Sequence, residues 1–146
     1  LSDREGTVRI DVGDLLRNSR VRFGPDAAEG GELCPTVTWD DLDALHGPFE
    51  RAVLWLDIEY AEWDALLGAR RLLERGAVLL ANVELMSSSH RDKVADVMGL
   101  MTAHGFRAVA DWNASERCRD RVFVREDLLE AERDRQRKIK KGERHA

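Results

Sequence analysis

Residues 52–60 read AVLWLDIEY, an unbroken apolar run that ends abruptly in acidic residues. Because the run does not alternate between polar and apolar positions, it predicts a β-strand covered on both faces, as in a parallel sheet. Residues 61–75 follow with apolar side chains at helical spacing, and Gly76 then suits a left-handed helix cap. The stretch therefore predicts one strand–helix unit of an α/β fold.

The same order recurs further along the chain. A second apolar run at 77–83 precedes a helical pattern that starts at a capping box of Ser89 and Asp92 and stops at Gly105. Two more strands are expected near 107–112 and 121–125, and the connection between them is too short for a crossover, so they should form an antiparallel hairpin. Buried strands alternating with helices predict an α/β fold with a mainly parallel sheet.

The flanking segments are less regular. Residues 7–12 alternate as a half-buried strand does, and residues 18–35 are punctuated by Gly and Pro, which favours a loop. Residues 40–45 predict a brief helix capped by Thr38 or Asp40. We expect a partial α/β domain over 1–125 and a charged terminal helix and tail over 126–146.

Composition narrows the class of protein. The chain has 146 residues, of which 35% are charged and 43% hydrophobic, and this balance fits one soluble globular domain rather than a disordered chain. It contains no apolar run long enough to span a membrane and no visible signal peptide. We therefore expect a cytoplasmic protein in which Cys34 and Cys118 are reduced thiols.

Charge is distributed unevenly along the sequence. Residues 125–146 hold eight basic and six acidic side chains, a net charge of +2. Because the whole chain has a formal charge of −5, residues 1–124 carry a net charge of −7. Such an acidic body would repel a phosphate backbone, which argues against a nucleic-acid partner. The basic tail lacks aromatic residues that stack on bases and is interpreted as a solvated helix end.

Candidate site residues follow the two apolar runs. In an open α/β sheet, ligands bind beyond the carboxyl ends of the parallel strands, where Asp57, Glu59 and Glu62 follow the first run. Glu84 and His90 follow the second run, close to Asn82. The helix dipole alone would explain Glu59 and Glu62, and His90 also suits a helix cap. Asp57 is harder to explain structurally, because a carboxylate that interrupts an apolar run is costly to bury.

Several chemistries lack their usual motifs. The sequence contains no P-loop, no GxGxxG, no serine nucleophile elbow and no HExxH or paired CxxC. The carboxylates and His90 could in principle gather Mg²⁺ or Zn²⁺, but no metal-ligand spacing supports such a site, so no metal is predicted.

Residues 53–69, VLWLDIEYAEWDALLGA, resemble the FkbM-type methyltransferases, which use S-adenosylmethionine. That family shows a hydrophobic strand that runs into a K-I-D-V-E-G-A-E block, followed by a helix that ends near L-x-G-A. Segments 2–8, 37–42 and 82–85 agree in kind, so the resemblance covers about 1–125. The matching residues of the central block are Asp57, Glu59, Ala61, Glu62, Leu67, Gly68 and Ala69.

Two positions depart from the family pattern. Trp55 stands where the family has Lys, which removes a cation that would pair with the carboxylates. Tyr60 stands where the family has Gly, which lets the chain turn tightly into the helix.

The resemblance implies a Rossmann-like class I methyltransferase sheet, of which this chain would be the carboxyl-terminal half, the cofactor half being expected before Leu1. It implies S-adenosylmethionine as cofactor and methylation of an oxygen on a small molecule or sugar. Asp57 would act in catalysis and bind the cofactor, Glu59 would act in catalysis, and Glu62, Glu84 and His90 would bind the substrate.

Two other functions stay open. One is a non-catalytic α/β module, a degenerate methyltransferase that serves in protein interaction, and the other is a metal-dependent hydrolase. A half sheet would also leave its first buried strand without a neighbour on one side, exposing apolar surface.

Overall fold

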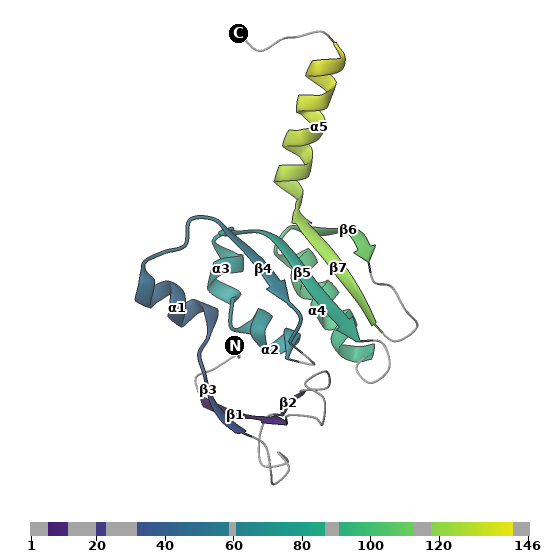
Figure 1. The fold of residues 1–146 in the computed structure, drawn as a ribbon. Coiled ribbons are helices and arrows are strands. Elements are labelled where there is room, and N and C mark those ends of the chain that lie inside the picture. Colours follow the sequence, from purple (N-terminus) through teal and green to yellow (C-terminus); the bar gives the residue numbers. More distant parts are fainter. Residues whose placement is uncertain are drawn as a thin grey trace.

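The computed structural model describes residues 6–11, 20–22, 32–58, 61–86, 91–112 and 118–141. Its elements follow one another as Figure 1 shows. In chain order they are β1 (Gly6–Asp11), β2 (Arg20–Arg22), β3 (Glu32–Thr36), α1 (Trp39–His46), β4 (Ala52–Leu56), α2 (Glu62–Leu67), α3 (Arg70–Glu74), β5 (Val78–Met86), α4 (Arg91–Ala103), β6 (Phe106–Trp112), β7 (Cys118–Arg125) and α5 (Glu126–Lys140).

The main sheet has four strands in the order β4-β5-β7-β6. The β4–β5 pair is parallel, as expected for strands joined through helices, and the β6–β7 hairpin is confirmed. The expectation of a mainly parallel sheet is wrong, because β7 turns back and pairs antiparallel with β5 from Leu80↔Val124 to Met86↔Cys118. This return places β7 between β5 and β6, so only one neighbouring pair in this sheet is parallel.

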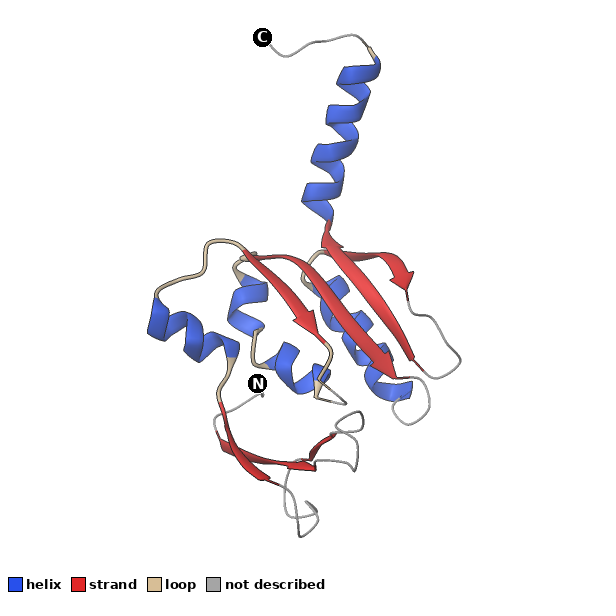
Figure 2. Cartoon of the chain, viewed as in Figure 1, coloured by secondary structure: helices blue, strands red, loops and turns tan. Residues whose placement is uncertain are grey.

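The core lies between this sheet and three helices. Figures 1 and 2 show α2, α3 and α4 on one side of the sheet. The buried apolar residues of this layer include Leu54, Leu56, Leu66, Leu72, Ala81, Val83, Val97, Met101 and Phe123. A single apolar layer between one sheet face and its helices therefore holds the fold.

The opposite face of β4 is open. Val53 and Trp55 are each 64% exposed, so the expectation of a strand covered on both faces is wrong. The physical reason is that no helix in the described part of the chain lies over this face (Figure 2). β4 also has β5 as its one strand neighbour among the described residues, which agrees with the expectation of an unpaired side.

The predicted helix over 61–75 is divided into α2 and α3. Asp40, in α1, accepts hydrogen bonds from the backbone N–H groups of Arg71 at 3.0 Å and Leu72 at 3.2 Å. A carboxylate at this place satisfies N–H groups at the start of a helix, so α3 begins anew after the turn at Gly68. Gly76, with a φ of 71°, ends α3 as predicted.

The amino-terminal segment forms a small antiparallel sheet of β2, β1 and β3. The strand expected at 7–12 is confirmed by β1, whereas the loop expected at 18–35 is wrong in part because β2 and β3 lie inside it and both pair with β1. The capping role of Thr38 is confirmed, since its hydroxyl accepts from the Asp41 N–H at 2.9 Å. The predicted capping box at Ser89 lies outside the described residues.

An ion pair fastens α1 to the end of α3. The guanidinium of Arg75 donates to the carboxylate of Asp43 at 2.6 Å and to the carbonyl of Phe49 at 2.9 Å. The Arg75 guanidinium, and after it the hydrogen bond from the Phe49 N–H, lower the pKa of Asp43 to about 2. Asp43 therefore stays ionised throughout the ordinary pH range, and the link between α1 and α3 persists with it.

The terminal helix α5 projects from the end of β7 (Figure 1). Its residues from Glu130 onward are exposed, and it carries ion pairs such as Asp134–Arg137 at 3.1 Å along its surface. Such a helix depends on its own side-chain pairs rather than on packing. No helix of the described chain is both long and apolar enough to cross a bilayer.

The open face of β4 predicts unequal effects of two substitutions in one strand. Leu56→Ala removes a side chain that is 1% exposed and should lower the free energy of unfolding by about 2–5 kcal/mol. Val53→Ala, on the open face, should change it by about 0.5 kcal/mol or less. Urea unfolding of both variants measures the difference, and an equal loss in Val53→Ala would show that this face is covered.

Candidate functional site

The first candidate residue follows β4 directly. β4 ends at Leu56, and Asp57 is exposed at the carboxyl end of the strand. The carboxylate therefore has access to solvent, and the cost of burial that its place in the sequence suggested does not arise. Glu59 lies outside the described residues.

Glu62 lies in the opposite environment. It is the first residue of α2, is only 6% exposed, and accepts a hydrogen bond from the Ile58 N–H at 2.9 Å. Burial raises the pKa of Glu62 to about 6, the Ile58 N–H opposes this rise, and the negative charges of Glu84 and Asp57 add to it. The Glu84 and Asp57 carboxylates thus lie close enough to act on Glu62.

Glu84 continues this acidic region on β5. It is half-buried and stands opposite Asp120 of β7 in the strand register, so both project from the same sheet face. That face is the open one, because Asn82, two residues earlier, is level with the exposed Trp55. The open face therefore becomes acidic toward the carboxyl end of β5.

Asn82 adds a buried polar group to this face. Its side chain is 1% exposed, and its Oδ1 accepts a hydrogen bond from Trp112 Nε1 at 3.3 Å. Its Nδ2 has no hydrogen-bond partner within the described residues. Sequence reasoning placed Asn82 near the site but missed Trp112. The contact between them forms only because β6 pairs with β7, which in turn pairs with β5.

The structure thus brings together part of the predicted site. Asp57, Glu62 and Glu84 gather at the carboxyl ends of the parallel pair, as the expected sheet geometry required. Glu59 and His90 lie outside the described residues. Within the described ranges, no group of three His, Cys, Asp or Glu side chains is arranged to hold a metal ion.

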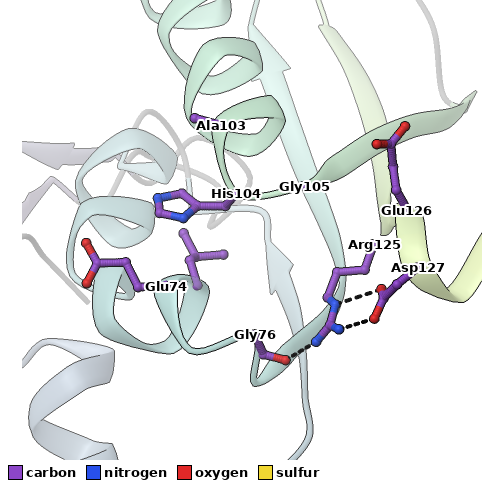
Figure 3. Close-up of a pocket in the computed structure, with 9 residues that line it drawn as sticks. Glu74, Gly76, Ala103, His104, Gly105, Arg125, Glu126 and Asp127 are labelled. Atoms are coloured by element: carbon purple, nitrogen blue, oxygen red, sulfur yellow. Dashed lines mark hydrogen bonds and ion pairs between the residues drawn. The ribbon is translucent and has the colours of Figure 1, made fainter.

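An open cavity of about 460 Å³ lies at the other end of the sheet (Figure 3). It is formed where α3 and α4 end and α5 begins, and its lining includes His104 and Glu126. Arg125 is already engaged there, donating to the Gly76 carbonyl and to the Asp127 carboxylate. Because β5 begins just after Gly76, this cavity lies away from the carboxyl ends where ligands of α/β sheets bind.

The position of Gly76 follows from the same contact. A Cβ at this residue would lie 2.8 Å from an Arg125 guanidinium nitrogen, and the backbone φ is 71°. Both features favour glycine, so this end of the sheet is shaped by packing between α3, β5 and β7.

Comparison with known proteins gives one match. A family model described as the methyltransferase FkbM domain matches residues 17–108. No curated protein and no solved structure matches the chain. The matched range contains β4, α2 and β5, and therefore the three carboxyl groups of the candidate site.

The raised pKa of Glu62 predicts a pH-dependent effect of Glu62→Gln. The folded protein binds a proton here up to about pH 6, against the ordinary value of 4.5, so wild-type stability falls as the pH rises through this window. The neutral variant escapes this loss and should gain about 2 kcal/mol relative to wild type between pH 4 and pH 8. Urea unfolding at both pH values measures the gain.

The exposed Glu74 supplies the control, since Glu74→Gln should shift little across the same range. A Glu62→Gln difference that is independent of pH would contradict the buried environment described for Glu62.

Proposed function

Because the chain belongs to the FkbM methyltransferase domain family, whose members use S-adenosylmethionine, we propose that it transfers the methyl group of this cofactor to an oxygen of a small molecule or sugar. The observation that carries the proposal is the match of the family model over the segment that holds Asp57, Glu62 and Glu84. These groups stand at the sheet edge where α/β proteins bind their ligands. A cytoplasmic location stays a prediction.

The chemistry of this edge suits the cofactor. S-adenosylmethionine carries a positively charged sulfonium and an ammonium group, and the exposed Asp57 and half-buried Glu84 present negative charge to the same region. When bound, the cofactor supplies an activated methyl group. The protein then has to hold the acceptor oxygen in line with that methyl and take up the proton that the acceptor loses.

The roles divide according to position. Asp57 leaves the strand end exposed and would position the cofactor or acceptor, and Glu59, two residues later in the sequence, would act in catalysis. Glu84, near the carboxyl end of the second strand of the parallel pair, and His90, which follows that strand in the sequence, would contact the acceptor. The buried Asn82 amide, fixed through its oxygen by Trp112, keeps its Nδ2 amino group on this face without a partner among the described residues.

Asp57→Ala tests the proposal directly. In the complete protein, S-adenosylmethionine should bind saturably in isothermal titration, and methyl transfer should fall about 10²-fold in the variant because alignment at the reacting centre is lost. Circular dichroism should stay unchanged, since Asp57 is exposed.

The matched control is Asp96→Ala, which removes the same side chain from an exposed position on α4. Its activity should equal that of wild type. Unchanged turnover in Asp57→Ala would remove the role assigned to this residue.

A second candidate function is a non-catalytic module that binds another polypeptide. The observation that favours it is the open face of β4, where Val53 and Trp55 are exposed beside a strand edge with no described partner. Calorimetry separates the two functions. Failure of the complete protein to bind S-adenosylmethionine at millimolar concentration would favour the module and reject the methyltransferase.

A further inference from the structure

Among its described residues, the turn between β4 and α2 has one backbone hydrogen bond, and it is weak. Between β4 and α2, the Ala61 N–H reaches the Ile58 carbonyl at 3.4 Å, which is long for a hydrogen bond. Ala61, the N-cap of α2, offers no side-chain hydrogen bond to the start of the helix. The bond from the Ile58 N–H to Glu62 Oε1 is 2.9 Å and closes the same turn from the helix side. This carboxyl therefore supplies the shortest hydrogen bond that the structure gives between the strand end and the helix.

Burying that carboxyl works against stability. At 6% exposure the carboxylate loses most of its hydration, which an apolar side chain of similar size would not. The backbone N–H groups of Ile58 and of Glu62 itself compensate only part of this loss, since the pKa of Glu62 remains raised. The carboxyl accepts a hydrogen bond from the Ile58 N–H, which an apolar side chain could not do.

The hydrogen bond between Ile58 and Glu62 also constrains Asp57, the residue before Ile58. The Ile58 N–H belongs to the peptide unit whose carbonyl is that of Asp57, and a peptide unit is planar. The Ile58 side chain also packs against the core, so this unit is held on both sides. Fixing the plane fixes the direction in which Asp57 leaves β4.

From this geometry we propose that Glu62 is a positioning residue, whose buried carboxyl holds the turn after β4 so that Asp57 meets the cofactor or acceptor in one orientation. This inference rests on the proposed function. It assigns Glu62 to the site through its bond with Ile58, without contact with substrate. A proton-accepting role would instead require that the acceptor reach the buried carboxyl.

Glu62→Met and Glu62→Gln test the inference on the full chain. Met has similar length and suits burial, so this variant should fold with a melting temperature equal to or above that of wild type, yet it lacks the acceptor for the Ile58 N–H. Gln keeps an acceptor oxygen and cannot take a proton. Glu74→Met, at an exposed position on α3, is the matched control.

Two measurements are made on each variant. Amide hydrogen exchange of Ile58, followed by nuclear magnetic resonance, should accelerate about tenfold or more in Glu62→Met, as expected for loss of a hydrogen bond to a charged group. The Kd of S-adenosylmethionine, from isothermal titration, should rise several-fold in the same variant. Glu62→Gln should restore both quantities to near the wild-type values, and Glu74→Met should change neither.

The outcomes separate the two proposals. Failure of the complete wild-type protein to bind S-adenosylmethionine would reject the proposed function, and the positioning role with it. Wild-type binding together with unchanged Ile58 exchange or unchanged affinity in Glu62→Met would reject the positioning role alone. Loss of binding in Glu62→Gln equal to that in Glu62→Met would also reject it, because charge or proton transfer would then be the property required.

Discussion

The parallel pairing of β4 and β5 is the constraint on which the rest of the structure depends. Parallel neighbours need a crossover, and α2 and α3 supply it while covering one face of both strands with Leu66 and Leu72. The same pairing brings the carboxyl ends of the two strands side by side, which is why Asp57 and Glu84 share one edge. Core formation and site assembly are thus consequences of one strand pair.

The open face of the sheet has its own physical consequence. On the covered face, β4 and β5 present apolar side chains to helices, whereas on the open face Trp55 stands level with Asn82. Asn82 is nevertheless buried, with its oxygen bonded to Trp112. Its Nδ2 has no partner among the described residues, and a buried donor without a partner is costly.

Sequence patterns predicted the helices and strands better than they predicted which of them lie next to one another. The strand at 52–56, its helix and the left-handed Gly76 follow from local periodicity and backbone preference, and all three are present. The break between α2 and α3 could not be predicted, because the group that causes it, Asp40, lies far away in the chain. The pairing of β7 with β5 could not be predicted either, because the two strands are distant in the sequence.

The candidate site shows the same division. The position of Asp57 beyond a strand follows from the sequence, as does its proximity to Glu84 once parallel strands are expected. Exposure did not follow, because the apolar run 52–56 was interpreted as covered on both faces and only one face is. Trp112 was missed for a related reason, since nothing local indicates that β6 will reach Asn82.

The acidic block at residues 57–62 has an exposed end at Asp57 and a buried end at Glu62, and its spacing connects the two. The chain passes from strand to helix between Asp57 and Glu62. The Asp57 carboxyl is therefore exposed, and the Glu62 carboxyl is buried. A shorter connection would leave no room for the turn, and an uninterrupted strand would place residues 57 and 62 on opposite faces. The inner carboxyl bonds to Ile58, the residue that follows the outer one. The spacing therefore does more than repeat negative charge, because it lets the buried acid of the block hold the exposed acid in place.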